Sequence, residues 1–519
     1  MLRQVVLLVA CLLAAALAGA LAAQLMGPEA DFDLRNYHLY NGFALLHGRL
    51  DGDLAPAQLQ SFLAPDLDLI YAGLLHMLNR HPGWLGAVLA LPQGLAGYLV
   101  WCLTRRALPE AMPARGWLAG AAALAGVTGA AGVSTFASAM SEMLPASCLL
   151  GAMLLLMSGS TRPRAGWAGL LAGCAMGLKL TAAPFAVGLM VAAALTGERG
   201  GRRISALLWF VTTSFCGAAL LGGAWWEWLW VRFGDPMFPY FNEIFRSPWV
   251  APVPGTDLRF LPRDVWQAVG YPLFWGFTRT TLVNELPVRD PRVALGWVAA
   301  FALLGRAWRG RMRPAECVLL SVWIIGYVLW EARFSILRYL VPLELLSGAL
   351  VVAALAPWLA RRPAIQVVPA AWALAAGLIA VTVYPNWGHA PPGHVAVSVH
   401  PPAFAPGSLV VLLDPSPMAY VAVFVPPTVR FVGANNNLVR PGAPGRLAHA
   451  VAKAIRTQVG PLWGLEEPGE SPGVADATLR AFDLVRAPGC ARVRSNLDGD
   501  AILACPLRRL SRTAGPHAG

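Results

Sequence analysis

The stretch QVVLLVACLLAAALAGALAAQLM, residues 4–26, contains no ionisable side chain. About 20 such residues suffice to cross the roughly 30 Å hydrocarbon core of a bilayer as one helix. A secretory signal peptide would have a similar composition, but no convincing small-x-small cleavage site precedes Gln24. Because many similar blocks follow along the chain, we interpret residues 4–26 as an uncleaved first transmembrane helix.

Composition extends this interpretation to most of the chain. Of its 519 residues, 57% are hydrophobic and 13% are charged, whereas soluble globular proteins have about 25% charged residues. The sequence therefore predicts an all-α polytopic membrane domain of about 11 transmembrane helices. We expect these helices at residues 4–26, 83–103, 116–133, 143–158, 165–179, 182–197, 204–228, 293–306, 316–332, 340–358 and 365–384, with the 165–197 stretch forming a hairpin broken near Thr181 and Pro184.

The formal net charge of +12 is explained by topology rather than by nucleic-acid binding. Arginines gather in short loops between apolar blocks, as the positive-inside rule expects of cytoplasmic loops. With these loops inside, the N-terminus is cytoplasmic and the C-terminus extracytoplasmic. Residues 62–79 are then assigned to the outer interface, because counting them as a span would place Arg105 and Arg106 outside. The loop arginines are Arg105, Arg106, Arg115, Arg162, Arg164, Arg199, Arg202, Arg203, the 306–313 group, Arg361 and Arg362.

The composition changes from Pro385 onward. Apolar runs at 407–413, 420–425 and 429–433 predict strands, and the segments of helical spacing at 446–457 and 476–482 predict helices. We therefore divide the chain into a transmembrane domain, residues 1–384, and a small extracytoplasmic (periplasmic) α/β domain, residues 385–519. Two long external loops, 27–82 and 229–290, belong to the first domain in this division.

The cysteines support an extracytoplasmic C-terminal domain. Six of them, at positions 11, 102, 148, 174, 216 and 317, lie in or beside apolar helices as core filling. Cys490 and Cys505 instead flank a hairpin-like stretch with Asn496–Gly499 at its turn. A four-residue loop there pairs Ser495 with Asp500 and sets Cys490 opposite Cys505, so we predict a disulfide and an oxidising compartment. Two buried thiols are the alternative.

The most informative polar stretch is GPEADFDLRNYHLYN, residues 27–41. Gly27-Pro28 ends the first helix, and Asp31 or Asp33 can cap a new helix that runs to about His47. Helical spacing places Asp33, Tyr37, Tyr40, Asn41 and Ala44 on one polar and aromatic face. Such a face suits a wet cleft at the bilayer surface, where either acid could serve as a general base. Helix capping and solvated loop charge are the alternative.

Other acids of the first loop are expected to differ in role. Asp66 and Asp68 lie in a half-apolar segment, where an acid is costly unless it is solvated, paired or functional. Asp51 and Asp53 lie in a Gly-containing polar turn and are expected to be ordinary surface charges.

Three ionisable residues are predicted at the outer ends of transmembrane helices: Glu142, Lys179 and Arg338, the last followed by Tyr339. Arg binds phosphate oxygens bidentately and Lys adds a point charge, so the two cations suit a lipid phosphate. Snorkelling at a helix end is the alternative for each residue alone. In the second loop, the aromatic stretch GDPMFPYFNEIF, residues 234–245, forms either a wall that guides a lipid tail or an interfacial aromatic belt.

Together these segments resemble the GT-C superfamily, the multi-pass glycosyltransferases that use polyprenyl-phosphate-linked sugars. Asp31-Phe32-Asp33 occupies the place of that superfamily's catalytic loop, Arg338-Tyr339 followed by Pro342 looks like its late Arg-Tyr-x-x-Pro signature, and Gly177-Leu178-Lys179 resembles a mid-chain feature. The resemblance covers residues 1 to about 360 and extends to an uncharacterised bacterial branch. Gln60–Pro65 replaces the Lys-Pro-Pro-Leu or His-Pro-Pro-Leu of better-known branches, which leaves the donor sugar undetermined.

The resemblance implies an inverting sugar transfer at the periplasmic face of a bacterial inner membrane, from a polyprenyl-phosphate donor to a glycan, lipid or protein acceptor of the cell envelope. It assigns the base to Asp31, with Asp33 orienting the acceptor or sharing the role. Arg338, Tyr339, Lys179 and Glu142 are expected at the lipid phosphate, and Tyr37, His38 and Asn41 at the substrate. We therefore expect the two aspartates and Arg338 to border one pocket at the outer leaflet of the membrane. A divalent cation between Asp33 and Glu142 is a further expectation, which no His cluster supports.

Two other classes of function stay open. A transporter or lipid flippase predicts ionisable residues deep in the bilayer and two related halves of inverted topology, and the sequence shows no internal repeat. A non-catalytic scaffold whose C-terminal domain binds an envelope partner is the third hypothesis. An O-antigen polymerase or ligase is close to the first hypothesis, but it relies on external Arg and His rather than on an acidic first loop.

Overall fold

A computed structural model describes residues 2–197, 200–252 and 257–510. Its contacts divide the chain into two compact units. Unit 1 comprises Met1–Ala22, Gly86–Ala224 and Thr256–Trp387, and unit 2 comprises Ala23–Leu85, Trp225–Gly255 and Gly388–Gly519. The start of the last segment of unit 2 lies near the boundary expected at residue 385, but unit 2 also contains the whole of the first external loop and part of the second. Arg199 and residues 511–519 lie outside the described residues.

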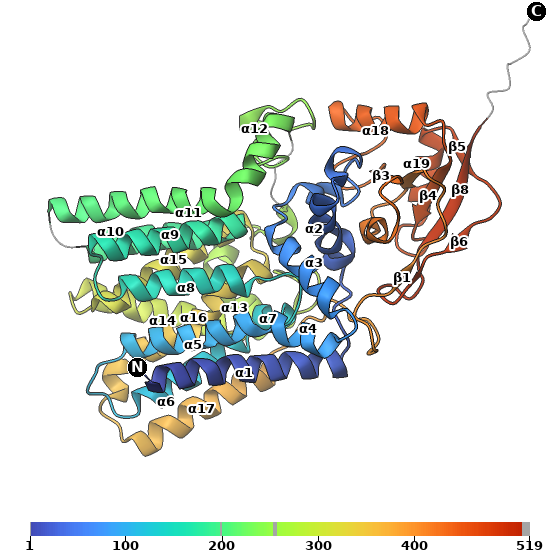
Figure 1. The fold of residues 1–519 in the computed structure, drawn as a ribbon. Coiled ribbons are helices and arrows are strands. Elements are labelled where there is room, and N and C mark those ends of the chain that lie inside the picture. Colours follow the sequence, from blue (N-terminus) through green and yellow to red (C-terminus); the bar gives the residue numbers. More distant parts are fainter. Residues whose placement is uncertain (1, 198–199, 253–256, 511–519) are drawn as a thin grey trace, which may run out of the picture. The chain divides into compact units, whose positions relative to one another are not determined.

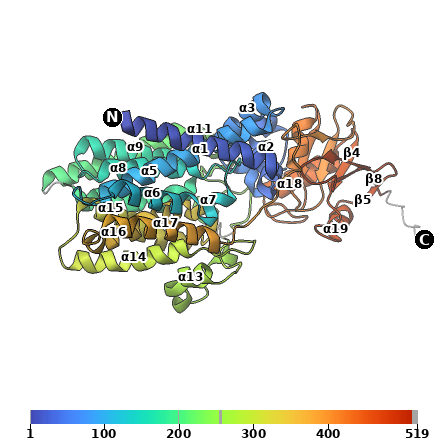
Figure 2. The same cartoon turned by 90° about the horizontal axis from the view of Figure 1, so that it is seen from below.

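Unit 1 consists of helices that run side by side (Figures 1 and 2). A helix lies at each of the expected transmembrane segments. The predicted break in the 165–197 hairpin is confirmed, because α9 ends at Leu178 and a single turn of 3-10 helix, Leu180–Ala182, precedes α10. The helices are α1 (Leu2–Leu25), α4 (Pro82–Leu89), α5 (Leu91–Ala107), α6 (Arg115–Val127), α7 (Ala130–Ser134), α8 (Met143–Leu156), α9 (Arg162–Leu178), α10 (Ala183–Thr196), α11 (Gly201–Phe233), α13 (Val265–Phe277), α14 (Pro291–Trp308), α15 (Pro314–Arg333), α16 (Val341–Leu359) and α17 (Ala364–Val381).

Six helical segments of the described chain are long and apolar enough to cross a membrane, by length and composition. They are Leu2–Leu25, Pro82–Ala107, Gly201–Phe233, Pro314–Arg333, Leu337–Leu359 and Ala364–Val381. Other expected spans are shorter apolar helices, among them Met143–Leu156 and Leu180–Thr196. The chain is thus a multi-pass membrane protein, and the count of about 11 spans stays a prediction.

Small residues allow close helix packing in unit 1. Gly169, Gly173 and Gly177 recur every fourth residue along α9 and face α11. A Cβ atom at Gly173 would lie 2.0 Å from the carbonyl oxygen of Ser214, so only glycine lets the two backbones approach this closely. Stripes of this kind are typical of helix contacts in membranes, where packing rather than water exclusion holds helices together.

The C-terminal part of unit 2 contains a mixed sheet with the strand order β3-β2-β4-β8-β5. The strand β2 (Leu409–Leu412) is parallel to β3 (Arg430–Gly433) and β4 (Leu462–Glu466), while β8 (Leu503–Arg509) is antiparallel to β4 and β5 (Leu484–Arg486). The predicted strands at 407–413 and 429–433 are confirmed as β2 and β3. The predicted helices are confirmed as α18 (Arg446–Thr457) and α19 (Val474–Ala481). The apolar run at 420–425 is a 3-10 helix, Ala419–Phe424.

The first external loop adds to the edge of this sheet. Leu54 forms a parallel bridge with Val432, and the Asp53 carboxylate accepts a hydrogen bond of 2.7 Å from Phe431 N. Arg49 lies 2.9 Å from Asp53 and donates to Val429 O at 2.7 Å. The expectation that Asp53 is a surface charge is therefore wrong, because the side chains of both partners are 2% exposed. Asp51 is exposed, as expected.

The aromatic stretch 234–245 contributes to the core of unit 2 at Phe238, which is 1% exposed. Its ring stacks on Phe233 with centroids 4.2 Å apart and meets the edge of Phe62 at 4.8 Å. At this position the stretch serves packing between the two external loops rather than contact with a lipid.

The predicted disulfide between Cys490 and Cys505 is present. Ala491 pairs with Ala504 and Arg492 with Leu503 across β6 (Ala491–Arg492) and β8, and Ser495 N donates to the side chain of Asp500. The hairpin register deduced from the sequence is therefore confirmed. The other six cysteines are free thiols.

Reduction of this disulfide is expected to destabilise unit 2. The bond closes a loop with a sequence separation of 15 residues, and the lost restriction of the unfolded chain corresponds to about 3 kcal/mol. Mass spectrometry should show a gain of two hydrogens on reduction, and thermal unfolding should shift downward in reductant. The Cys490→Ser/Cys505→Ser variant should show the lowered value without reductant, whereas Cys216→Ser should behave as wild type. An unchanged mass would contradict the pairing.

Candidate active site

The helix predicted after the first span begins with an irregular turn. Asp31 Oδ1 accepts a hydrogen bond of 2.7 Å from Leu34 N, so Asp31 performs the expected capping. The chain then forms a π-helical turn, Leu34–His38, before the α-helix α2 (Leu39–Leu46). The expectation of one regular helix is wrong in this first turn. Such π-turns are rare and frequently lie at functional sites.

The polar face of this segment is buried rather than open. Asp31 and Asp33 are 3% and 7% exposed, and Tyr37 OH lies 3.5 Å from Asp33 Oδ2. Two residues expected to line a wet cleft make hydrogen bonds within the protein instead. Tyr40 OH donates to Asp53 at 2.9 Å, and Asn41 Nδ2 donates to Gln60 O at 2.9 Å.

Asp31 lies in an acidic environment. Burial raises the pKa of its carboxyl above the ordinary value of 3.8, and the nearby Asp33 charge raises this pKa further. The hydrogen bond from Leu34 N and one with the Glu29 side chain lower the pKa in turn. The net effect is a carboxylate with an increased proton affinity, as a general base requires.

The segment from 388 to 390 lies beside this acidic loop. Ala30 N donates to Gly388 O at 3.2 Å, and Ala390 N donates to Pro28 O at 2.8 Å. His389, between them, is close enough for the Asp31 charge to raise its pKa, although burial lowers that pKa overall. Sequence reasoning missed Glu29 and His389, because no local pattern links residue 389 to residue 31.

His38 is paired with an acid of the following helix. Its Nδ1 lies 2.5 Å from Oδ1 of Asp68, in the first turn of α3 (Asp66–Leu78). The two side chains are 2% and 3% exposed. The sequence marked Asp68 as an acid that needs solvation, a partner or a function, and its partner is His38. Burial raises the pKa of the neighbouring Asp66.

In unit 1, Glu142 and Lys179 form an ion pair of 2.6 Å at the start of α8 and the end of α9. Lys179 also donates to Met140 O at 2.6 Å. Glu142 therefore compensates the Lys179 charge. This pair holds the turn before α8 against the turn between α9 and α10.

Arg338 and Tyr339 lie in a short 3-10 helix, Leu337–Leu340, directly before α16, and the Arg338 guanidinium lies 5.3 Å from the Tyr339 ring centroid. A Cβ atom at Gly188 of α10 would lie against Val322 of α15, and one at Gly326 against Phe185. These helices are therefore antiparallel, which brings the start of α10 and the end of α15 to one end of unit 1. The Lys179 turn and the Arg338 turn lie at that same end. This agrees with their predicted location on one side of the membrane.

Three further charged residues anchor this end of unit 1. The Glu344 carboxylate accepts hydrogen bonds from Ala131 N and Gly132 N at 2.9 and 2.8 Å, and Asp290 accepts one from Ala130 N at 2.8 Å. Asp290 also pairs with Arg292 at 2.9 Å. All three charged side chains are at most 1% exposed. The sequence does mark these three residues, because each is an ionisable residue inside or beside an apolar helix.

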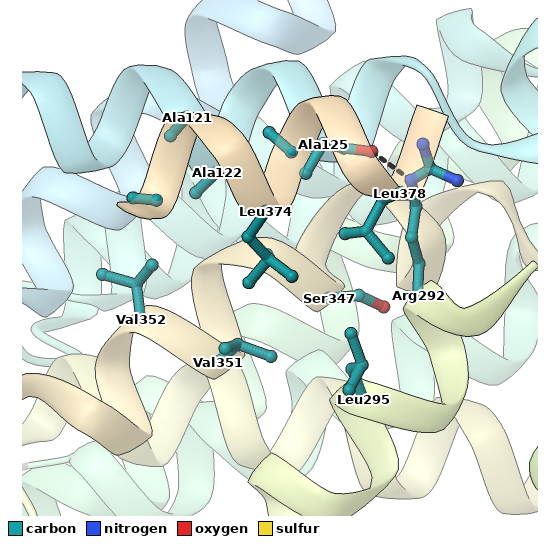
Figure 3. Close-up of a pocket in the computed structure, with 13 residues that line it drawn as sticks. Ala121, Ala122, Ala125, Arg292, Leu295, Ser347, Val351, Val352, Leu374 and Leu378 are labelled. Atoms are coloured by element: carbon teal, nitrogen blue, oxygen red, sulfur yellow. Dashed lines mark hydrogen bonds between the residues drawn. The ribbon is translucent and has the colours of Figure 1, made fainter. Parts of the chain in front are cut away.

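An apolar crevice lies between α6, α14, α16 and α17 (Figure 3). Its lining is hydrocarbon apart from Ser347 and Arg292. The Arg292 guanidinium donates to Ala125 O at 2.6 Å and to Thr382 Oγ1 at 2.7 Å. The crevice therefore presents an apolar surface rather than an anion site.

The fold has a counterpart among solved structures. The chain is similar over 99% of its length to the crystal structure of ArnT from Cupriavidus metallidurans bound to undecaprenyl phosphate, and the match covers 99% of that chain as well. The TM-score is 0.50 and the sequence identity is 14%. The chain has a GT-C-like fold. No family model and no curated protein sequence matches it.

The GT-C-like fold predicted from the short motifs is thus confirmed as a fold. The roles of Asp31, Asp33, Tyr37, His38, Asn41, Glu142, Lys179, Arg338 and Tyr339 stay predictions. The single pocket expected for the aspartates and Arg338 also stays a prediction, and these residues belong to different units. Within the described residues, no group of three or more His, Cys, Asp or Glu side chains is placed to hold a metal ion.

We expect the Asp31→Asn variant to be more stable than wild type near neutral pH. Because the pKa of Asp31 is raised, the folded chain binds this proton more tightly than the unfolded chain does. Wild type therefore loses stability as the pH rises from about 4 towards the raised pKa, and the variant lacks that loss. The difference in unfolding temperature should grow as the pH rises above about 4. A difference that does not change with pH for Asp31→Asn would contradict the explanation.

Proposed function

We propose that this protein is a membrane glycosyltransferase. It transfers a sugar from a polyprenyl-phosphate-linked donor to an acceptor of the cell envelope, at the periplasmic face of a bacterial inner membrane. The observation that carries the proposal is the GT-C-like fold, shared over 99% of both chains with a protein whose structure contains undecaprenyl phosphate. The buried acids of the first loop and the cations of unit 1 supply groups suited to the two halves of the reaction.

Asp31 is the proposed base. Its carboxylate is fixed by the hydrogen bond from Leu34 N, and burial with the Asp33 charge raises its pKa. A base with raised proton affinity removes the proton of the acceptor hydroxyl more readily. The oxygen then attacks the anomeric carbon while the lipid phosphate leaves from the opposite side, which makes the reaction inverting. Asp33, held beside Tyr37, orients the acceptor.

Arg338 is the proposed main ligand of the lipid phosphate. A guanidinium can donate two parallel hydrogen bonds to phosphate oxygens and cannot lose its charge. Lys179 is less suited to this role than the sequence suggested, because Glu142 already lies 2.6 Å from it. We assign the Glu142–Lys179 pair to positioning the turns at the same end of unit 1. Fixed positive charge lowers the barrier most where negative charge develops.

The Asp31→Asn variant is expected to lose transfer activity by about 100- to 10,000-fold, the usual contribution of a general base. The assay uses the purified full-length chain in nanodiscs with a panel of undecaprenyl-phosphate-linked sugars and envelope extract. Mass spectrometry follows the release of undecaprenyl phosphate. Asp51→Asn, a matched change at an exposed acid, should retain activity. Full activity of both Asp31→Asn and Asp33→Asn would exclude these acids from the mechanism.

The Arg338→Ala variant is expected to bind undecaprenyl phosphate about 10- to 100-fold more weakly, as the loss of a charged hydrogen-bonding partner predicts. Arg338→Lys should restore only part of the affinity, because an ammonium cannot form the bidentate fork. Native mass spectrometry in nanodiscs with defined lipid additions measures the binding. Arg309→Ala changes an exposed arginine just after α14, at the opposite end of that helix from Asp290, and should have no effect. Equal affinity for Arg338→Ala and wild type would contradict the assignment.

A further inference from the structure

The helix α13 has an apolar face that the rest of the described chain leaves uncovered. Its sequence, VWQAVGYPLFWGF, contains no charged residue. The uncovered residues recur every three or four positions and therefore lie on one side of the helix. They are 45% to 85% exposed and comprise Val265, Trp266, Val269, Leu273, Phe274 and Phe277. A contiguous apolar surface of this kind marks contact with another protein or with a membrane.

The opposite side of α13 is fixed against unit 1, where Tyr271 is 1% exposed. A Cβ atom at Gly276 would lie 3.0 Å from the Cβ atom of Ala294. The indole nitrogen of Trp297 donates to Val269 O at 3.2 Å. Because Ala294 and Trp297 belong to the first two turns of α14, the helix α13 packs beside the start of α14, as Figure 2 shows.

The uncovered face continues onto the exposed side of α14. The Trp297 ring, which reaches Val269 of α13, has its centroid 4.6 Å from that of Phe301. Phe301 is exposed, as are Val298 and Leu304 at helical spacing on the same helix. A lipid tail is as apolar as these side chains, so this side of an expected transmembrane helix suits lipid contact. The apolar surface of α13 extends that contact without a break.

Length and flanking charges decide how α13 meets the lipid. Its 13 residues extend about 20 Å, too short to cross a hydrocarbon core of about 30 Å. Arg263 and Asp264 directly precede the helix, and Arg279 follows it closely. A charged side chain inside hydrocarbon is costly, so both ends of α13 belong at the level of the headgroups. The helix axis then lies parallel to the membrane surface.

The two flanking arginines carry the charge that a headgroup surface attracts. Arg263 and Arg279 are exposed, and neither forms an ion pair within the part of the chain that the structure describes. Lipid phosphates would supply the missing negative charge through strong hydrogen bonds to the guanidinium groups. The large exposed ring of Trp266 is also of the type that gathers at the interface between membrane and water.

The segment after α13 shows which side of unit 1 is involved. Leu337 N, in the Arg338 turn, donates to Val283 O at 2.7 Å. We propose that α13 is an in-plane membrane helix whose apolar face is embedded in the leaflet on the Arg338 side of unit 1, with Arg263 and Arg279 at the lipid phosphates. In the predicted topology this is the outer leaflet. The partner is the lipid bilayer, and the inference does not depend on sugar transfer.

Depth measurements with spin labels in nanodiscs test the orientation. The six free cysteines are replaced by alanine, and single nitroxide labels are attached in the Trp266→Cys, Leu273→Cys and Phe277→Cys variants. Collision rates with oxygen and with a water-soluble nickel complex give the depth of each label. All three labels should lie about 5–10 Å below the phosphates. Val298→Cys on α14 and the fully exposed Val459→Cys after α18 are the references for lipid and for water.

Three results would overturn the proposal. A helix perpendicular to the membrane would give a depth difference of about 16 Å between positions 266 and 277, at about 1.5 Å per residue. Nickel accessibility equal to that of Val459→Cys would indicate an aqueous face. Low accessibility to both reagents would indicate cover by protein, such as a second copy of the chain.

A second measurement keeps the native cysteines. The difference in tryptophan fluorescence between wild type and Trp266→Phe isolates the emission of one exposed ring. Brominated lipid tails should quench this emission, whereas iodide in the aqueous phase should not. Quenching by iodide, or no quenching by the lipid, would overturn the proposal.

Discussion

An ionised group in apolar surroundings is costly, and this cost governs how the charged residues of the chain are arranged. With 13% charged residues in a chain of 57% hydrophobic residues, each buried charge needs a defined partner. In unit 1, Asp290 pairs with Arg292, Glu142 pairs with Lys179, and Glu344 takes up two backbone N–H groups at the start of α7. These contacts fix the turns at one end of the unit, because breaking any of them leaves a charge buried without compensation.

Asp31 is the informative exception. Its side chain is 3% exposed, and its nearest charged neighbours include other acids. A loop under selection for stability alone would place an arginine there, as the chain does for Asp53 with Arg49. The raised pKa of the Asp31 carboxyl therefore favours a chemical role, in which increased proton affinity is useful.

The two external loops and the C-terminal sheet share one hydrophobic core in unit 2. Leu54 extends the sheet beside Val432, and Phe62 and Phe238 pack together. The segment around His389 pairs with the residues just before Asp31. The C-terminal region is therefore part of the framework that shapes the acidic loop.

Local patterns in the sequence were enough to predict the features that arise within short segments. Apolar blocks predicted most helices of unit 1, although not α13, which lies in the predicted second external loop. Apolar runs and helical spacing predicted β2, β3, α18 and α19, and the turn at Asn496–Gly499 predicted the Cys490–Cys505 register. Which polar groups meet depends instead on packing in three dimensions. The partners His38 and Asp68, Asp53 and Phe431, and Glu344 and Ala131 are separated by tens to hundreds of residues, so no local spacing encodes them. Their pairing follows from the packing of helices and strands, and a buried charge then takes the partner that this packing provides.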